Sequence, residues 1–239
     1  MPCEDQPPPT GPGNELAQFA NTVVSGPLKT GLSGVPELTN LFSYLPWYLK
    51  VSVQERLFGA PKTDLFLAEK YTNLKQYYAS NILDVGSGRG DYAKMLKNDG
   101  YDVSCIDVVN KIQYEDLPFQ HYNGLDIPHP DKCFKTSLAM FVLHHADDQV
   151  RVLSEMARVT DGHMLIGEDV LENKLDRVFA EGHIRSSQWS QGSKGFHTHP
   201  EWLEIFKRLG LELVDMQRIP RFKEPIYPVA RRVYVLKTT

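Results

Sequence analysis

The sequence predicts an α/β fold: a Rossmann-like, doubly wound and mostly parallel sheet. From residue 81 onward, short apolar segments alternate with amphipathic ones, which is typical of strands alternating with helices. The first apolar segment runs into Gly86, Gly88 and Gly90, which predicts a tight turn from a strand into a helix. The last two apolar segments are joined by about 15 residues without a helical pattern, which favours an antiparallel pair.

The elements follow in chain order. Strands are predicted at 81–85, 102–106, 120–122, 137–143, 163–166, 211–216 and 232–236. Helices are predicted after Gly90, at 63–78, 147–159 and 171–179, and after the capping box of Thr198 and Glu201. Asp161 and Gly162 are interpreted as a turn into the fifth strand. The polar stretch 182–195 is predicted to be a loop.

Three regions are predicted along the chain. Residues 1–13 are proline-rich and are expected to be a disordered tail. Residues 14–79 are expected to form a helical lid or cap, and residues 80–239 the α/β domain, with a cover insertion at 170–200. The aromatic segment 38–58 fits three interpretations: a lid that excludes water, a membrane-surface or partner-binding helix, or a packing layer on the sheet.

Charge and hydropathy argue against nucleic-acid binding and against a membrane-spanning segment. The net charge of −4 gives no global basic field, so nucleic-acid binding is not favoured. No apolar run approaches the ~20 residues that span a bilayer, so no integral membrane segment is expected. The N-terminus lacks the apolar core of a secretory signal, and we therefore expect a cytoplasmic protein.

Two motifs carry a family resemblance. Asp84 precedes the glycine turn, and residues 84–90 read Asp-Val-Gly-Ser-Gly-Arg-Gly. This pattern resembles the first motif of class I S-adenosylmethionine-dependent methyltransferases of the small-molecule type. Residues 134–145, which end in Val-Leu-His-His, resemble the family's fourth-strand segment, although Lys135 replaces the usual Asp. The resemblance implies a seven-stranded sheet with an antiparallel last strand, S-adenosylmethionine as cofactor and S-adenosylhomocysteine as product.

The resemblance also implies a set of cofactor residues. Asp84 would face the methionine ammonium, Asp107 the ribose hydroxyls, and Asp126 the adenine amino group. Asp126 also fits a simple turn before Pro128. The full predicted set is Asp84, Gly86, Ser87, Gly88, Gly90, Asp107, Val108, Leu125, Asp126, Ile127 and Phe141.

Histidines are the candidate bases for the acceptor, because their pKa lies near working pH. His145 is the best placed, and His144 and His197 are the other candidates for proton transfer or substrate contact. A metal site made of His183, His197 and His199 is not favoured, because His-x-His in a loop lacks a specific ligand spacing. No resident metal is therefore predicted.

The sequence thus predicts transfer of a methyl group to an oxygen or nitrogen of a small apolar or aromatic metabolite. An NAD(P)-dependent oxidoreductase is the first alternative, because an acid at the end of the second strand also occurs in nicotinamide-binding folds. A non-catalytic, methyltransferase-like binding module is the second. The acceptor's identity and the oligomeric state are not predicted.

Overall fold

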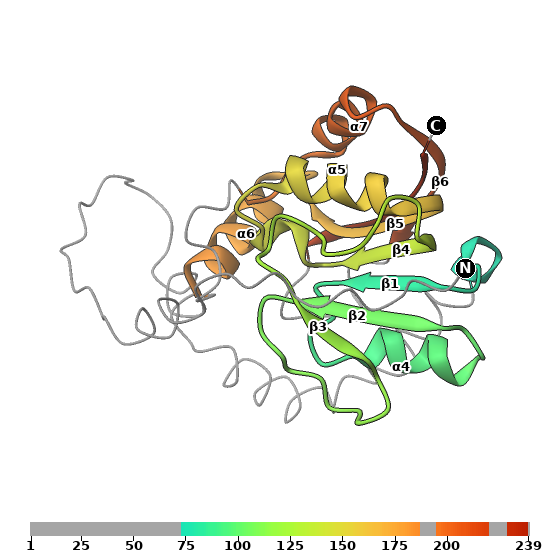
Figure 1. Cartoon of the computed structure of the whole chain (residues 1–239). Coiled ribbons are helices and arrows are strands. Elements are labelled where there is room, and N and C mark those ends of the chain that lie inside the picture. The colour runs from blue at the N-terminus through green and yellow to red at the C-terminus, as the bar shows by residue number, and fades with distance from the viewer. Residues whose placement is uncertain (1–72, 187–194, 220–228, 239) are drawn as a thin grey trace.

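The structure is a computed structural model that describes residues 73–186, 195–219 and 229–238 (Figure 1). The predicted tail, the aromatic segment 38–58 and nearly all of the predicted lid lie outside the described residues. Within the described part of the chain, no helix is long and apolar enough to cross a membrane.

A seven-stranded mixed sheet forms the centre of the fold. Its strand order is β3-β2-β1-β4-β5-β7-β6. Strand β7 runs antiparallel to both of its neighbours, and the other pairings are parallel. This confirms the predicted sheet and its reversed last strand. The strands are β1 (Ile82–Val85), β2 (Val103–Asp107), β3 (Phe119–His121), β4 (Phe134–Met140), β5 (Thr160–Val170), β6 (Leu211–Ile219) and β7 (Ala230–Thr238).

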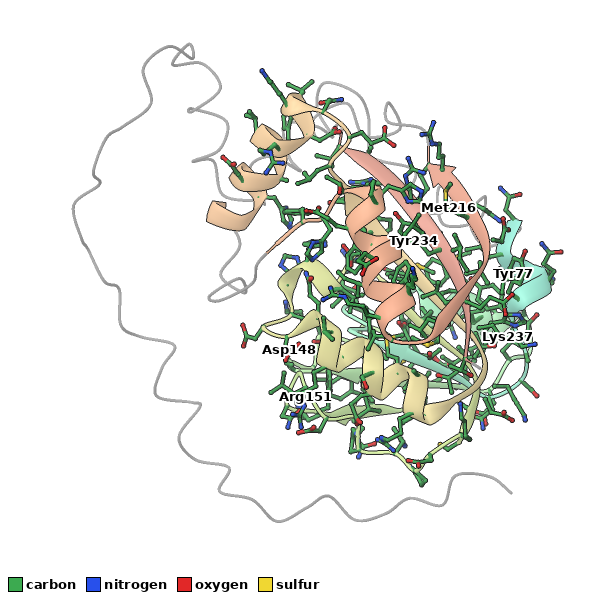
Figure 2. The ribbon with its side chains drawn as sticks, turned by 90° about the horizontal axis from the view of Figure 1, so that it is seen from above. Tyr77, Asp148, Arg151, Met216, Tyr234 and Lys237 are labelled. Carbon is green, nitrogen blue, oxygen red and sulfur yellow. The ribbon has the colours of Figure 1, made fainter. Side chains whose placement is uncertain are left out.

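Helices cover both faces of the sheet (Figure 1). They are η2 (Lys75–Tyr77), α4 (Asp91–Asn98), η3 (Leu143–His145), α5 (Gln149–Val159), α6 (Lys174–Ser186) and α7 (His199–Arg208). Helix α4 packs with η2 in one core cluster, and α5 packs with α7 in the other. Viewed from above, α7 lies over Tyr234 of β7 (Figure 2), whose ring meets Phe206 edge-on. The predicted capping box of Thr198 and Glu201 is present at the start of α7.

Several predicted boundaries are wrong. Strand β4 ends at Met140 rather than at residue 143, because Phe141 has a φ of 59° and leaves the extended conformation. Gly162 lies inside β5 and makes no turn. Its missing Cβ admits the Lys135 carbonyl oxygen, which would lie 2.3 Å from an added Cβ. Helix α6 continues to Ser186, into the stretch predicted as a loop.

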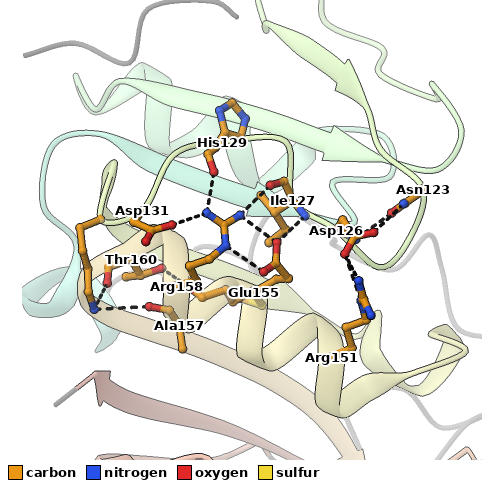
Figure 3. Close-up of polar contacts among 12 residues, drawn as sticks. Asn123, Asp126, Ile127, His129, Asp131, Arg151, Glu155, Ala157, Arg158 and Thr160 are labelled. Carbon is orange, nitrogen blue, oxygen red and sulfur yellow. Dashed lines mark hydrogen bonds and ion pairs between the residues drawn. The ribbon is translucent and has the colours of Figure 1, made fainter. Parts of the chain in front are cut away.

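Arg158 ties the connection between β3 and β4 to helix α5 (Figure 3). Its guanidinium donates to the backbone carbonyls of Ile127 and His129 and to the carboxylates of Asp131 and Glu155. Both carbonyls belong to a loop, in which the Ile127 carbonyl also accepts from the His129 N–H at 2.8 Å. Arg158 therefore fixes the loop that carries the predicted adenine residues.

We expect Arg158→Met to lower the free energy of unfolding by about 1–3 kcal/mol, because it removes the charged donor that two loop carbonyls and a half-buried carboxylate share. Arg151, on the same helix, is the matched control. It pairs with the Asp126 carboxylate in solvent, so Arg151→Met is expected to leave stability nearly unchanged. Urea unfolding of both variants measures the difference. Equal losses would show that Arg158 acts only as a surface ion pair.

Candidate functional site

The glycine turn after β1 is held against the end of β2. The N–H groups of Gly86 and Ser87 donate to the Ile106 carbonyl oxygen at 2.8 and 3.2 Å. The Gly88 N–H donates to Oδ2 of Asp107 at 2.8 Å. Gly86, Gly88 and Gly90 have φ angles of 70°, 54° and 82°, a region in which residues with a Cβ are strained. The alternate glycines are thus a requirement of this backbone.

Two polar groups beneath the turn lack hydrogen-bond partners among the described residues. They are Oδ2 of Asp84, whose residue is 3% exposed, and Oγ of Ser87. Burial, with a smaller contribution from the negative charge of Asp107, raises the pKa of Asp84 to about 7. A buried carboxylate without a partner is costly, and a cationic ligand would remove that cost. A Cβ built on Gly88 meets nothing within 4 Å, so there is space beside the turn.

The residues predicted around the adenine divide between surface and core. Val108 is exposed after β2, and it lies 3.1 Å from a Cβ built on Gly124, so the connections after β2 and β3 are adjacent. Leu125 is half-buried in the second of these connections. Asp126 accepts from Asn123 and pairs with Arg151, while Ile127 is buried in the core. The Asp126 carboxylate is therefore already engaged by two side chains.

Residues after β4 close the turn from the other side. A Cβ on Gly86 would lie 2.2 Å from Cγ2 of Val142, so Val142 packs directly on the turn. Phe141 donates its N–H to the Gly167 carbonyl oxygen, and its ring lies 5.3 Å from the Arg231 guanidinium carbon. Arg231 also bonds Asp169 at 2.9 Å. Sequence analysis did not select Arg231, because its position follows from the antiparallel pairing of β5 with β7.

Histidine side chains gather beyond the ends of β4 and β5. His144 Nδ1 lies 2.7 Å from Oε2 of Glu168, and both residues are buried. Burial opposes the charged form of His144, but attraction to Glu168 and the hydrogen bond with it outweigh burial and raise its pKa. His145 Nε2 lies 3.3 Å from His183 Nε2. Burial and the neighbouring His144 and His183 lower the pKa of His145 to about 3, so His145 is neutral at physiological pH.

The other predicted histidines bond elsewhere. His197 Nε2 lies 2.6 Å from the Gln149 side-chain oxygen, and its ring packs against Trp202. His199 Nδ1 lies 3.1 Å from the Tyr234 hydroxyl. The structure therefore joins His183 to His144 and His145, and not to the two histidines with which sequence analysis grouped it.

Comparison with known proteins identifies the fold and the motif region. Residues 83–166, which span β1 to the middle of β5, match a protein family described as a methyltransferase domain. This part of the chain is therefore similar to a methyltransferase domain. Its strand order, its glycine turn and its match to this family agree.

Individual relatives support this assignment. The chain is 26% identical over 161 residues to the uncharacterized methyltransferase YcgJ of Bacillus subtilis strain 168, across 57% of this chain and 59% of that protein. It therefore spans about three fifths of the length of this curated relative. A SAM-dependent methyltransferase from Methanosarcina mazei superposes with a TM-score of 0.58 at 16% identity, over 70% of this chain and 97% of that one.

The same fold also supports other chemistry. The [4+2]-cyclase SpnF superposes with a TM-score of 0.53 at 15% identity, over 82% of this chain and 83% of that one. At such identities a superposition establishes the fold alone. The activity must therefore be argued from the site.

We expect the pKa of Asp84 to make the stability of the folded protein depend on pH. Its folded value of about 7 exceeds the ordinary 3.8, so the folded state keeps a proton that the unfolded state releases. Stability should therefore fall as the pH rises from about 4 to about 7. Asp84→Asn should flatten this dependence and raise the free energy of unfolding near pH 8, by at most about 4 kcal/mol.

Urea unfolding over a pH series measures this effect. Asp102→Asn, an exposed carboxyl next to the opposite end of β2, is the control and should keep the wild-type slope. An unchanged slope in Asp84→Asn would contradict the assigned pKa.

Proposed function

We propose that this protein transfers the methyl group of S-adenosylmethionine to a small-molecule acceptor. The observation that supports the proposal most directly is the unpartnered carboxyl oxygen of Asp84 beside the glycine turn. The cofactor carries an ammonium group that complements a buried carboxylate. A nicotinamide dinucleotide instead presents a pyrophosphate, which would be repelled by Asp84 once this residue is ionised.

The residues present fit this cofactor. Asp84 would bind the ammonium, directly or through water. Asp107 has two carboxylate oxygens, of which Oδ2 accepts from Gly88 and Oδ1 only weakly from the Val109 N–H at 3.4 Å. It can therefore accept from ribose hydroxyls while still holding the turn. The connections that carry Val108 and Leu125 would border the adenine, and Phe141 the methionine part. Asp126 is the predicted cofactor residue with the least support, because its carboxylate already pairs with Arg151.

The protein's own contribution to transfer is alignment and the fate of the acceptor's proton. When bound, the cofactor supplies an electrophilic methyl group on a sulfonium. The glycine turn and Val142 would fix it on one side, and the histidines after β4 would face its methyl end. His145 is neutral, and the histidine cluster to which it belongs would border the acceptor hydroxyl or amine. Such an acceptor would be an oxygen or nitrogen of a small apolar or aromatic compound.

Turnover separates this proposal from its rivals. A methyltransferase converts S-adenosylmethionine to S-adenosylhomocysteine when an acceptor panel is supplied. A methyltransferase-like binding module would bind the cofactor without turnover, and an oxidoreductase would require a nicotinamide. Mass spectrometry of cofactor and methylated acceptor therefore distinguishes all three.

We expect Asp107→Ala to lower the affinity for S-adenosylhomocysteine by about 10- to 100-fold, or about 1–3 kcal/mol. The reason is the loss of charge-assisted hydrogen bonds to the ribose and of the support for Gly88. Asp102→Ala changes an exposed acid at the opposite end of β2 and should bind as the wild type does. Calorimetry measures both. Equal affinities in the two variants would remove Asp107 from the cofactor site.

A further inference from the structure

Three imidazoles meet beyond the carboxyl end of β4. His144 and His145 come from η3, and His183 comes from α6. Each offers one ring nitrogen, and the three nitrogens lie within 4.8 Å of one another. We propose that His144, His145 and His183 bind one divalent transition-metal ion, of which Zn²⁺ is the best match. We further infer that the ion has an open coordination position toward the methyl acceptor.

The spacing of the nitrogens suits a tetrahedral ion. His145 Nε2 and His183 Nε2 are 3.3 Å apart. Two ligands at the usual Zn–N distance of about 2.0–2.1 Å and a tetrahedral angle stand about 3.3–3.4 Å apart. The ring centroids of the three histidines are 4.2 to 5.3 Å from one another, so the rings surround a common point. Little local rearrangement is needed to receive an ion.

Glu168 supplies the outer-shell support that histidine ligands usually have. Its Oε2 lies 2.7 Å from His144 Nδ1, and its Oε1 accepts from the Leu143 N–H at 2.7 Å. Both carboxylate oxygens are thereby fixed. His144 therefore holds its proton on Nδ1 and would bind a metal through Nε2. A carboxylate that orients a ligating histidine in this way also raises the basicity of the ligand.

One ring nitrogen of the cluster has no polar partner in the part of the chain that the structure describes. His145 Nδ1 is buried without a hydrogen-bond partner among the described residues. The two Nε2 atoms that face each other cannot both carry protons. Neutral imidazoles are good ligands for Zn²⁺, Co²⁺ and Ni²⁺, and three of them leave a position open for a further ligand. Phe196 stacks on His144 at 4.7 Å and shields the cluster on that side.

The ion would act on the acceptor. An acceptor hydroxyl bound to it would lose its proton to solvent near neutral pH. The oxygen lone pair then forms the new bond to the methyl carbon, and the carbon–sulfur pair stays on sulfur, which leaves a neutral thioether. This role rests on the proposed function, whereas metal binding itself does not.

The first experiment measures metal binding on the full, tag-free chain. After removal of metal by a chelator, the wild type should take up one Zn²⁺ per chain and, with Co²⁺, show the intense visible absorption of a tetrahedral site. His183→Ala should abolish that absorption and weaken Zn²⁺ binding by more than about 100-fold. His121→Ala removes an exposed histidine of β3 and should behave as the wild type does. Far-UV circular dichroism confirms that each variant is folded.

Glu168→Gln is the sharper second variant. Because Oε1 must still accept from Leu143, the new amide NH₂ would face His144 Nδ1. That nitrogen must then accept, which moves the ring proton to Nε2 and removes the metal ligand. We expect Zn²⁺ affinity to fall by about 10- to 100-fold. The proposal is overturned if the wild type takes up no Zn²⁺, or if His183→Ala and His121→Ala bind it equally.

Cofactor binding is measured separately on the metal-free protein. If Zn²⁺ binds at the histidines while S-adenosylhomocysteine does not bind, the metal site is upheld and the proposed function fails. If the cofactor binds and Zn²⁺ does not, the proposed function is upheld and the metal site is rejected.

Discussion

The hydrogen bond from the Gly88 N–H to Asp107 is the constraint on which the glycine-turn end of the candidate site depends. It joins the turn after β1 to the last residue of β2, and the Ile106 carbonyl oxygen adds two further bonds to the same turn. The turn can donate these hydrogen bonds only because its glycines adopt positive φ angles. The arrangement leaves Asp84 buried beneath the turn with one oxygen unpartnered among the described residues. Ionisation of Asp84 therefore lowers the stability of the folded state.

The reversed strand organises the other end of the site. Because β7 is inserted antiparallel between β5 and β6, Arg231 lies opposite Asp169, and its guanidinium lies near Phe141. On β5, Glu168 holds His144 through one oxygen and the backbone of η3 through the other. The histidine side of the site is therefore built from pairs between distant segments, whereas the glycine-turn side is built from one turn and its neighbouring strand.

This difference explains how much could be predicted from the sequence. The positions of Gly86, Gly88 and Asp107 could be predicted from the local sequence, because the glycines lie in the turn after a predicted strand and Asp107 directly follows another. The seven-stranded sheet with its reversed last strand followed from the family resemblance and is confirmed. The contact between His145 and His183 joins residues 38 apart in the chain, and that between Asp169 and Arg231 joins residues 62 apart. No periodicity in the sequence reports such contacts, and sequence analysis therefore grouped His183 with the wrong histidines.

Local rules also failed where tertiary packing overrides them. Asp161 and Gly162 have the composition of a turn, yet they continue β5, because the Lys135 carbonyl oxygen occupies the space of a Cβ at Gly162. Phe141 has a φ of 59° and ends β4 early, although its side chain suits a strand. The roles of the predicted cofactor residues remain predictions that follow from this geometry.

Calorimetric titration of the wild-type protein with S-adenosylhomocysteine and with NAD⁺, under identical conditions, tests the central claim most directly. A single site that binds S-adenosylhomocysteine, with no heat of binding from NAD⁺, is the result that this account predicts. Saturable binding of NAD⁺ without binding of S-adenosylhomocysteine would contradict it.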